Sequence, residues 1–166
     1  MNGKVLRLKD YLREDMILMN LRVRDKKALF RKVAEYLRAR GIIKHPAKIV
    51  KVLLSREKLG STSIGGGVAL PHARSKELDR TVVVVVHLQE PVKFSPGEEP
   101  VKVAIFIFNS ADINSSYIQI LARLARLLRN PQNRKALLES GDASGVLKVF
   151  EDFDRNAEEI ERKLRG

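Results

Sequence analysis

The sequence contains no cysteine, which excludes disulfides, thiol nucleophiles and thiolate metal sites. Aromatic residues make up only 5% of the chain, so it offers few platforms on which nucleic-acid bases stack. No stretch approaches the roughly 18–20 consecutive apolar residues of a membrane span. The first ten residues, MNGKVLRLKD, also lack the apolar core of a signal peptide. We therefore expect a cytoplasmic protein with no membrane insertion.

Charge is strongly unbalanced, because 32 Lys and Arg against 20 Asp and Glu give a formal net charge of +12. Such an excess invites nucleic-acid binding as a hypothesis. The basic residues are interspersed with acids and form no run of five or more, so nucleic acid is an unlikely partner. Arg123, Arg126 and Arg129 recur along one side of a predicted helix. They indicate a solvated face or, as an alternative, a docking surface for an acidic partner.

The length of 166 residues and the 44% hydrophobic content predict one domain over residues 1–166. We expect its core at about 5–152 and a C-terminal helical tail at about 153–166. Continuous β-branched, apolar runs at 81–88 and 101–108 predict two central strands, with a loop or edge excursion between them.

Amphipathic periodicity predicts helices on both sides of these strands, and a short strand is expected at 17–21. An α/β fold follows, a three-layer α/β/α sandwich with a mixed central sheet. The helices are expected at 25–40, 46–58, 114–129 with a cap near Asn114 or Ser115, 131–140, and a last one capped by Asp142 or Ser144.

The candidate functional residues are concentrated in residues 56–74, REKLGSTSIGGGVALPHAR. Gly65, Gly66 and Gly67, preceded by the hydroxyls of Ser61 and Thr62, offer donors for an oxyanion, although a glycine run by itself usually marks a turn. The stretch has neither the Lys-Ser/Thr ending of a P-loop nor the GxGxxG spacing after a strand. ATP and NAD binding are therefore not supported.

His72 follows the apolar residues 68–70 and the rigid Pro71. A neutral imidazole is a good nucleophile near neutral pH and can hold a phosphoryl group as phosphohistidine. Arg56 and Thr62 would then stabilise the transferring group, because phosphoryl transfer depends on positioning and charge neutralisation. The alternatives are an ordinary loop histidine and an arginine that only interacts with the carbonyls at a helix end.

Glu57, six intervening residues and then IGGGVALPHA at 64–73 resemble the phosphorylation-site signature of the fructose–mannitol type IIA components of the bacterial phosphotransferase system. That family includes the nitrogen-regulatory IIA proteins. The resemblance implies that His72 accepts phosphate on Nε2 from the carrier HPr and passes it to a IIB partner or uses it for regulation, without a cofactor. It also places Arg56 beside the phosphohistidine and makes residues 61–67 part of the pocket wall.

One departure concerns a second histidine that family members carry in a His-Leu pair after the last core strand. This sequence has Tyr117 and Ile118 there, and tyrosine donates a hydrogen bond but does not become a cation. The resemblance therefore suggests Tyr117 as a phosphate-binding residue. A non-catalytic regulatory module that retains the fold is the alternative.

The remaining histidines, His45 and His87, are assigned no role. His45 is expected in a solvated turn and His87 in a buried strand. No combination of histidines and carboxylates has metal-ligand spacing, so no metal site is predicted.

Overall fold

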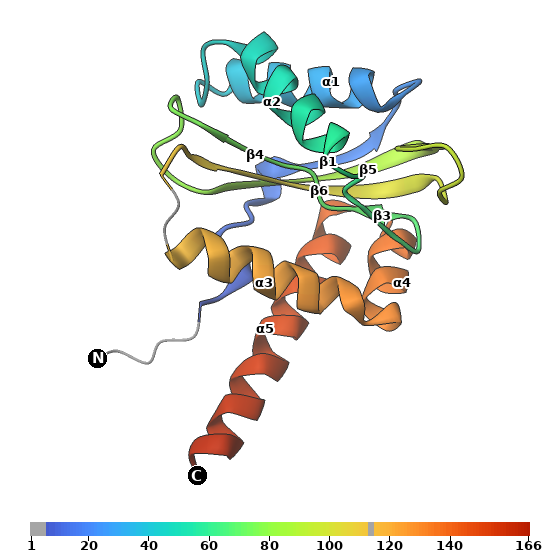
Figure 1. Ribbon diagram of the computed structural model, residues 1–166. Coiled ribbons are helices and arrows are strands. Elements are labelled where there is room, and N and C mark those ends of the chain that lie inside the picture. Colours follow the sequence, from blue (N-terminus) through green and yellow to red (C-terminus); the bar gives the residue numbers. More distant parts are fainter. Residues whose placement is uncertain (1–5, 113–114) are drawn as a thin grey trace.

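The computed structural model describes residues 6–112 and 115–166. Its centre is a mixed, six-stranded sheet, and helices cover both faces (Figure 1). Helices α1 (Lys26–Ala39) and α2 (Pro46–Lys58) lie on one face, and the C-terminal helices lie on the other. This arrangement confirms the predicted three-layer α/β/α fold. None of the helices within the described ranges is long and apolar enough to cross a membrane.

Five strands form the path β1-β5-β6-β3-β2, and β4 also pairs with β6. β5 runs antiparallel to β6 and parallel to β1, whereas β3 and β4 both run parallel to β6. The strands are β1 (Ile17–Leu21), β2 (Ser63–Gly65), β3 (Val68–Ala69), β4 (His72–Ser75), β5 (Val82–Val92) and β6 (Val101–Ser110).

The two central strands were predicted as such, and both are buried along most of their length. β5 continues past the expected end to Val92, although Gln89, Glu90 and Pro91 are exposed. The first residues of the predicted loop, up to Val92, therefore belong to β5, and the chain turns between Val92 and the start of β6. Strands β2 and β3 lie in the glycine-rich stretch and were not predicted, because strands of two or three residues carry no periodic signal.

On the α1–α2 side, the core is built around Phe30, which is fully buried. Its ring packs edge-on against Phe94 and Phe106, with ring centroids 5.9 and 5.7 Å apart. α1 begins where predicted, because the side chain of Asp25 accepts a hydrogen bond from the Ala28 N–H at 2.7 Å.

The opposite face carries α3 (Ser115–Arg129), α4 (Pro131–Glu139) and α5 (Ala143–Arg165). Asp142 caps α5 through the Gly145 N–H at 2.8 Å. The cap expected at Asn114 or at the side chain of Ser115 lies outside the described residues. α5 is one continuous helix that includes the predicted tail and projects below the other layers (Figure 1).

Asp154, near the middle of α5, is buried at 2% exposure. Its carboxylate accepts hydrogen bonds from the backbone N–H groups of Leu8 at 2.9 Å and Lys9 at 3.0 Å. These contacts attach the short 3-10 helix Leu8–Asp10 to α5. The packing of α5 thus continues past residue 152, where the sequence places the end of the core.

Replacing Asp154 by alanine is expected to lower the free energy of unfolding by about 2–3 kcal/mol, because two backbone donors lose a charged acceptor. Denaturant unfolding measures the change. Asp152→Ala is the control, because Asp152 only pairs with Arg155 on the surface at 3.3 Å. Equal effects of the two substitutions would contradict a structural role for Asp154.

Candidate functional site

His72 is the first residue of β4, an edge strand that pairs with β6. It lies opposite Ile107, and the Ile107 N–H donates to the carbonyl of Pro71 at 3.0 Å. Ala73 is buried in the core beneath α1 and α2. Because side chains alternate along a strand, His72 and Arg74 point to the other face, where α3 lies. The sheet therefore holds the backbone of His72 in place.

The two ring nitrogens of His72 have different partners. Nδ1 lies 3.0 Å from the carbonyl oxygen of Leu70, which can only accept, so Nδ1 carries the proton and donates. In the neutral ring Nε2 then has no proton, and its lone pair can accept a hydrogen bond. Arg56 donates to it from Nε at 3.2 Å. The partners thus select the tautomer in which Nε2 is the nucleophilic atom.

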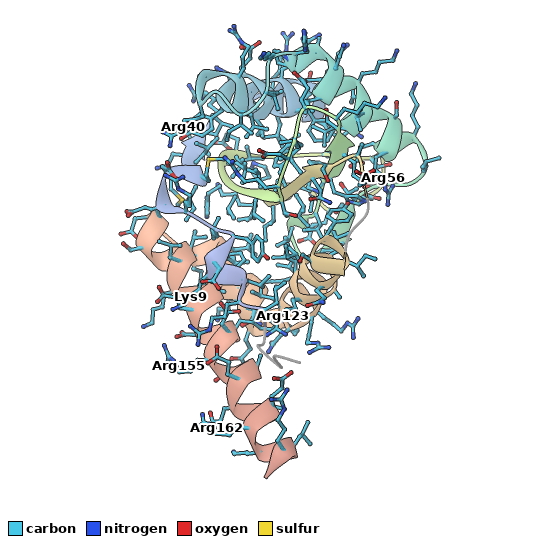
Figure 2. All side chains as sticks on the ribbon, turned by 90° about the vertical axis from the view of Figure 1, so that its left-hand side faces the viewer. Lys9, Arg40, Arg56, Arg123, Arg155 and Arg162 are labelled. Carbon is cyan, nitrogen blue, oxygen red and sulfur yellow. The ribbon has the colours of Figure 1, made fainter. Side chains whose placement is uncertain are left out.

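Arg56 comes from the last turn of α2 (Figure 2). Its Nη1 also donates to the carbonyl of Gly60 at 2.9 Å, which fixes the guanidinium between the loop after α2 and the histidine ring. The structure therefore brings together the two residues for which the sequence predicts catalytic roles. A positive charge lies where a phosphoryl group on Nε2 would need compensation.

Tyr117 reaches the same region from α3 and is 6% exposed. Burial raises the pKa of its phenol, whereas the positive charges of Arg74 and Arg56 act to lower that pKa. The raised pKa keeps the phenol neutral near pH 7, so its hydroxyl remains a hydrogen-bond donor. The influence of both guanidinium groups places Tyr117 near this cluster.

Arg74 is a residue that the sequence reasoning missed. It is exposed, and its Nη1 donates to the carbonyl of Ala111 at 3.2 Å, just beyond the end of β6. The signal was available in the order His-Ala-Arg, because residues two apart on a strand share a face. Without knowledge that His72 begins a strand, that alternation could not be used.

The hydroxyl groups of Ser61 and Thr62, predicted to bind phosphate, are already engaged as donors. Ser61 Oγ donates to Glu98 Oε2 at 2.8 Å. The Thr62 hydroxyl donates to Glu57, and its N–H donates to Glu57 Oε2 at 3.2 Å. Either hydroxyl would have to leave a carboxylate in order to reach a phosphate, so their role as phosphate ligands stays a prediction.

The side chain of Glu57 holds in place the loop after α2, which contains Ser61 and Thr62. This side chain is 3% exposed, and Lys26 Nζ lies 3.6 Å from Oε2. Lys26 also donates to the carbonyl of Phe94 at 2.8 Å. The carboxylate thus joins α1, α2 and Thr62, the residue that precedes β2. The resemblance includes Glu57 in the signature without giving it a role.

The glycine triplet forms the turn between β2 and β3. Gly65, Gly66 and Gly67 all have positive φ, at 85°, 64° and 80°, a region that other residues rarely occupy. A Cβ on Gly66 would lie 2.5 Å from Nε of Arg134 in α4. These backbone requirements are sufficient to explain three consecutive glycines. No bound ligand is needed to explain them.

The triplet lies away from His72 along β6. The Gly67 carbonyl accepts from the N–H of Lys102 at 2.7 Å and of Val103 at 3.1 Å. Val103 is four residues from Ile107, the partner of His72, which corresponds to about 13 Å along a strand. The structure does not bring the triplet beside the histidine, and its role as an anion cradle stays a prediction.

His45 and His87 have structural surroundings. His87 is 6% exposed, and its Nε2 donates to the Leu138 carbonyl at 3.0 Å. His45 is exposed, with Nδ1 2.9 Å from a carboxylate oxygen of Glu77. Across residues 6–112 and 115–166, no group of three or more histidine, aspartate or glutamate side chains could hold a metal ion.

A mixed sheet covered on both faces thus carries, on an edge strand, a histidine whose Nε2 accepts a hydrogen bond from an arginine. The family described as "Phosphoenolpyruvate-dependent sugar phosphotransferase system, EIIA 2" matches residues 10–153. The chain belongs to this family of phosphotransferase-system components, whose phosphocarrier role serves phosphotransfer or regulation.

Individual relatives agree with this assignment. A nitrogen regulatory protein of Bradyrhizobium diazoefficiens is 33% identical over 142 residues, which cover 85% of this chain and 92% of that protein. Nitrogen regulatory protein IIA-Ntr of Neisseria meningitidis superposes with a TM-score of 0.76 at 26% identity, over 86% of this chain and 98% of that one. The mannitol enzyme IIA of Escherichia coli, solved in complex with phosphorylated enzyme IIB, has a TM-score of 0.70 at 25% identity, over 85% and 97%.

Gly66→Ala is expected to lower the free energy of unfolding by about 1–2 kcal/mol from the left-handed backbone alone. Denaturant unfolding measures this loss, and Gly141→Ala, which has open space and no positive φ, is the control. If the triplet only forms a turn, the folded variant keeps its rate of phosphorylation. Loss of phosphorylation with unchanged stability would instead support the anion cradle.

The phenol of Tyr117 is expected to ionise above its ordinary pKa of about 10. The difference in ultraviolet absorbance between wild type and Tyr117→Phe during an alkaline titration isolates this group. Because the folded pKa is raised, the stability linked to the neutral phenol is complete below about pH 10 and is lost as pH rises through the folded pKa. A midpoint at or below 10 would contradict this environment.

Proposed function

We propose that His72 is the phosphorylated residue of this IIA component and that Nε2 carries the phosphoryl group. The observation that carries the proposal is the pair of contacts on the ring. The Leu70 carbonyl holds the proton on Nδ1, and Arg56 donates a hydrogen bond to the lone pair on Nε2. A histidine with an ordinary loop role has no need for both.

The chemistry follows from this tautomer. The Nε2 lone pair attacks phosphorus in a donor phosphohistidine, and the donor's P–N bond breaks as the new one forms, so the electron pair returns to the donor ring. Nε2 has no proton to lose. Positive charge that develops on the ring is stabilised by the Leu70 carbonyl through Nδ1–H.

Arg56 contributes charge and position. In the unphosphorylated protein it donates to Nε2, and on transfer it turns to the phosphoryl oxygens, which then lie where the lone pair was. Arg74, two residues further along the same face of β4, would add a second positive charge, and the neutral hydroxyl of Tyr117 would add a hydrogen bond. Tyr117 would thus supply a hydrogen bond in place of the second histidine of the family.

For the partners, we infer a histidine phosphocarrier of the HPr type as donor and a IIB component or a regulatory target as acceptor. The IIA–IIB complex of the mannitol system supports a IIB acceptor, and the nitrogen regulatory relatives support a regulatory target. Both are transfers between proteins. A site on an edge strand, with His72 half-buried, suits such an encounter.

A second candidate is a regulatory module that binds partners without phosphotransfer. Tyr117 at the position of the family's second histidine favours it, because the phenol cannot act as a cation. This candidate requires partner binding that is indifferent to His72→Ala.

Incubation with phosphoenolpyruvate, enzyme I and HPr is expected to add one acid-labile phosphoryl group, seen by intact-mass spectrometry. His72→Ala abolishes the addition, whereas His45→Gln, which removes an exposed histidine outside the site, does not. Arg56→Gln slows it by about 100-fold, the cost of one lost charge-stabilising donor.

Phosphate on the His72→Ala protein would refute the assignment of the acceptor. An unmodified wild type beside phosphorylated HPr in the same tube would exclude HPr as donor. It would also favour the second candidate.

A further inference from the structure

The positive charge of the chain is concentrated in one layer of the fold. Residues 26–58, which form α1, α2 and the turn between them, contain eleven Lys and Arg and only two acids, a net charge of +9. The other 133 residues together contribute the remaining +3. Figure 2 shows nitrogen-tipped side chains that project outward from this layer, in which Arg40 and Arg56 are labelled. Because these like charges repel one another, the layer favours a partner of opposite sign.

A groove of about 810 Å³ lies between α1 and α2. Its floor, which we define as Val50 and Leu54, is apolar. Val50 is only 8% exposed and Leu54 is half-buried, so the floor is recessed below the charged side chains around it. The lining residues of α2 extend from Pro46 to Lys58, which is about 18 Å at the helical rise per residue. The groove therefore has the length of a helix of about three turns.

Four basic side chains, which we call the rim cations, line the two walls of the groove. Lys27 and Arg31 are about one turn apart on α1, and Lys51 and Lys58 are about two turns apart on α2. All four residues are exposed. Within residues 6–112 and 115–166, none of these side chains forms an ion pair or a hydrogen bond.

The two acids that line the groove do not neutralise the rim cations. Glu57 is buried and pairs with Lys26 at 3.6 Å. Glu35 lies more than two turns further along α1 and pairs with Arg38 at 2.9 Å. The groove thus combines an apolar floor with positive charge that no acid of the described structure compensates.

These features limit what can occupy the groove. A helix with apolar residues at every third and fourth position and acids on both flanks fits the length, the floor and the rim cations together. The flat surface of a bilayer does not reach a floor that is recessed between two helices. Nucleic acid would leave the apolar floor without a contact, and the chain offers few aromatic side chains on which bases stack.

The last helix of this chain does not have the required charge. Residues 154–165 carry four acids and four bases, so this part of α5 is neutral overall. A second copy of the chain therefore offers the groove no acidic helix there. The charge of the groove points instead to a different protein.

We propose that the groove between α1 and α2 docks an acidic amphipathic helix of a partner protein. The apolar side of that helix packs on the floor, and its carboxylates pair with the rim cations on both walls. The partner lies on the same helix that supplies Arg56 to the candidate site, since Arg56 belongs to the last turn of α2. The proposal does not depend on phosphorylation of His72.

A synthetic helix tests the proposal. The probe is a peptide of about 14 residues with Leu at every third and fourth position and Glu on both flanks, cross-linked because short isolated helices are marginal in water. Fluorescence anisotropy at about 0.15 M salt is expected to give a Kd of about 50 μM or lower for the full chain. Two control peptides are expected to bind at least about tenfold more weakly. One carries Lys in place of Glu, and the other has the same composition in an order that removes the apolar stripe.

Charge reversal at the rim locates the binding site. The rim variant, Arg31→Glu with Lys51→Glu, changes one residue on each wall and is expected to weaken binding at least about tenfold. Lys32→Glu with Lys48→Glu is the matched control, because these exposed lysines lie on the same two helices but do not line the groove. This control is expected to keep the affinity within about threefold. The Lys-flanked peptide is expected to bind the rim variant more tightly than it binds the wild type, which shows that the variant is folded.

Four results would overturn the proposal. The first three are a Glu-flanked peptide that does not bind at about 1 mM, an equal loss of affinity in the rim variant and its matched control, and equal binding of the peptide that lacks the apolar stripe. The fourth comes from vesicles that contain phosphatidylserine and from duplex DNA, tested in parallel. If either binds the wild type but not the rim variant, while the Glu-flanked peptide does not bind, the groove would be assigned to lipid or to nucleic acid instead.

Discussion

The hydrogen bond from Nδ1 of His72 to the carbonyl of Leu70 decides which ring nitrogen is available for chemistry. It joins residues two apart in sequence, so its geometry depends on the backbone from Leu70 to His72. That backbone is held by pairing with β6, where the Ile107 N–H binds the Pro71 carbonyl. A central strand buried on both faces therefore sets the orientation of an imidazole at the edge of the sheet.

The other half of the site depends on a buried ion pair. Glu57 follows Arg56 directly in α2, and its carboxylate is neutralised by Lys26 from α1 and accepts two hydrogen bonds from Thr62. Breaking such a pair leaves one buried charge without compensation, which is far more costly than losing a surface pair. The end of α2 is thus held against the loop, and Arg56 is held against the histidine.

Much of this could be predicted from the sequence where the signal is local. The helices, the central strands and the facing of Arg56 to His72 follow from periodicity and from the signature. The position of Gly65–Gly67 could not be predicted, because it depends on Val103 and Lys102, which are more than thirty residues away in the chain. The Lys26–Glu57 pair and the strand alternation that aligns Arg74 with His72 likewise follow from tertiary pairing, which composition does not reveal.

The contact between Arg56 and Nε2 has a consequence for selectivity. A neutral imidazole with an open lone pair attracts transition-metal ions and stray electrophiles. Here a fixed guanidinium at 3.2 Å occupies that lone pair and repels cations. A phosphorylated donor, by contrast, brings negative oxygens that draw the guanidinium away from the nitrogen. Under the proposed function, the resting site is thus closed to cations and opens to an anionic phosphoryl group.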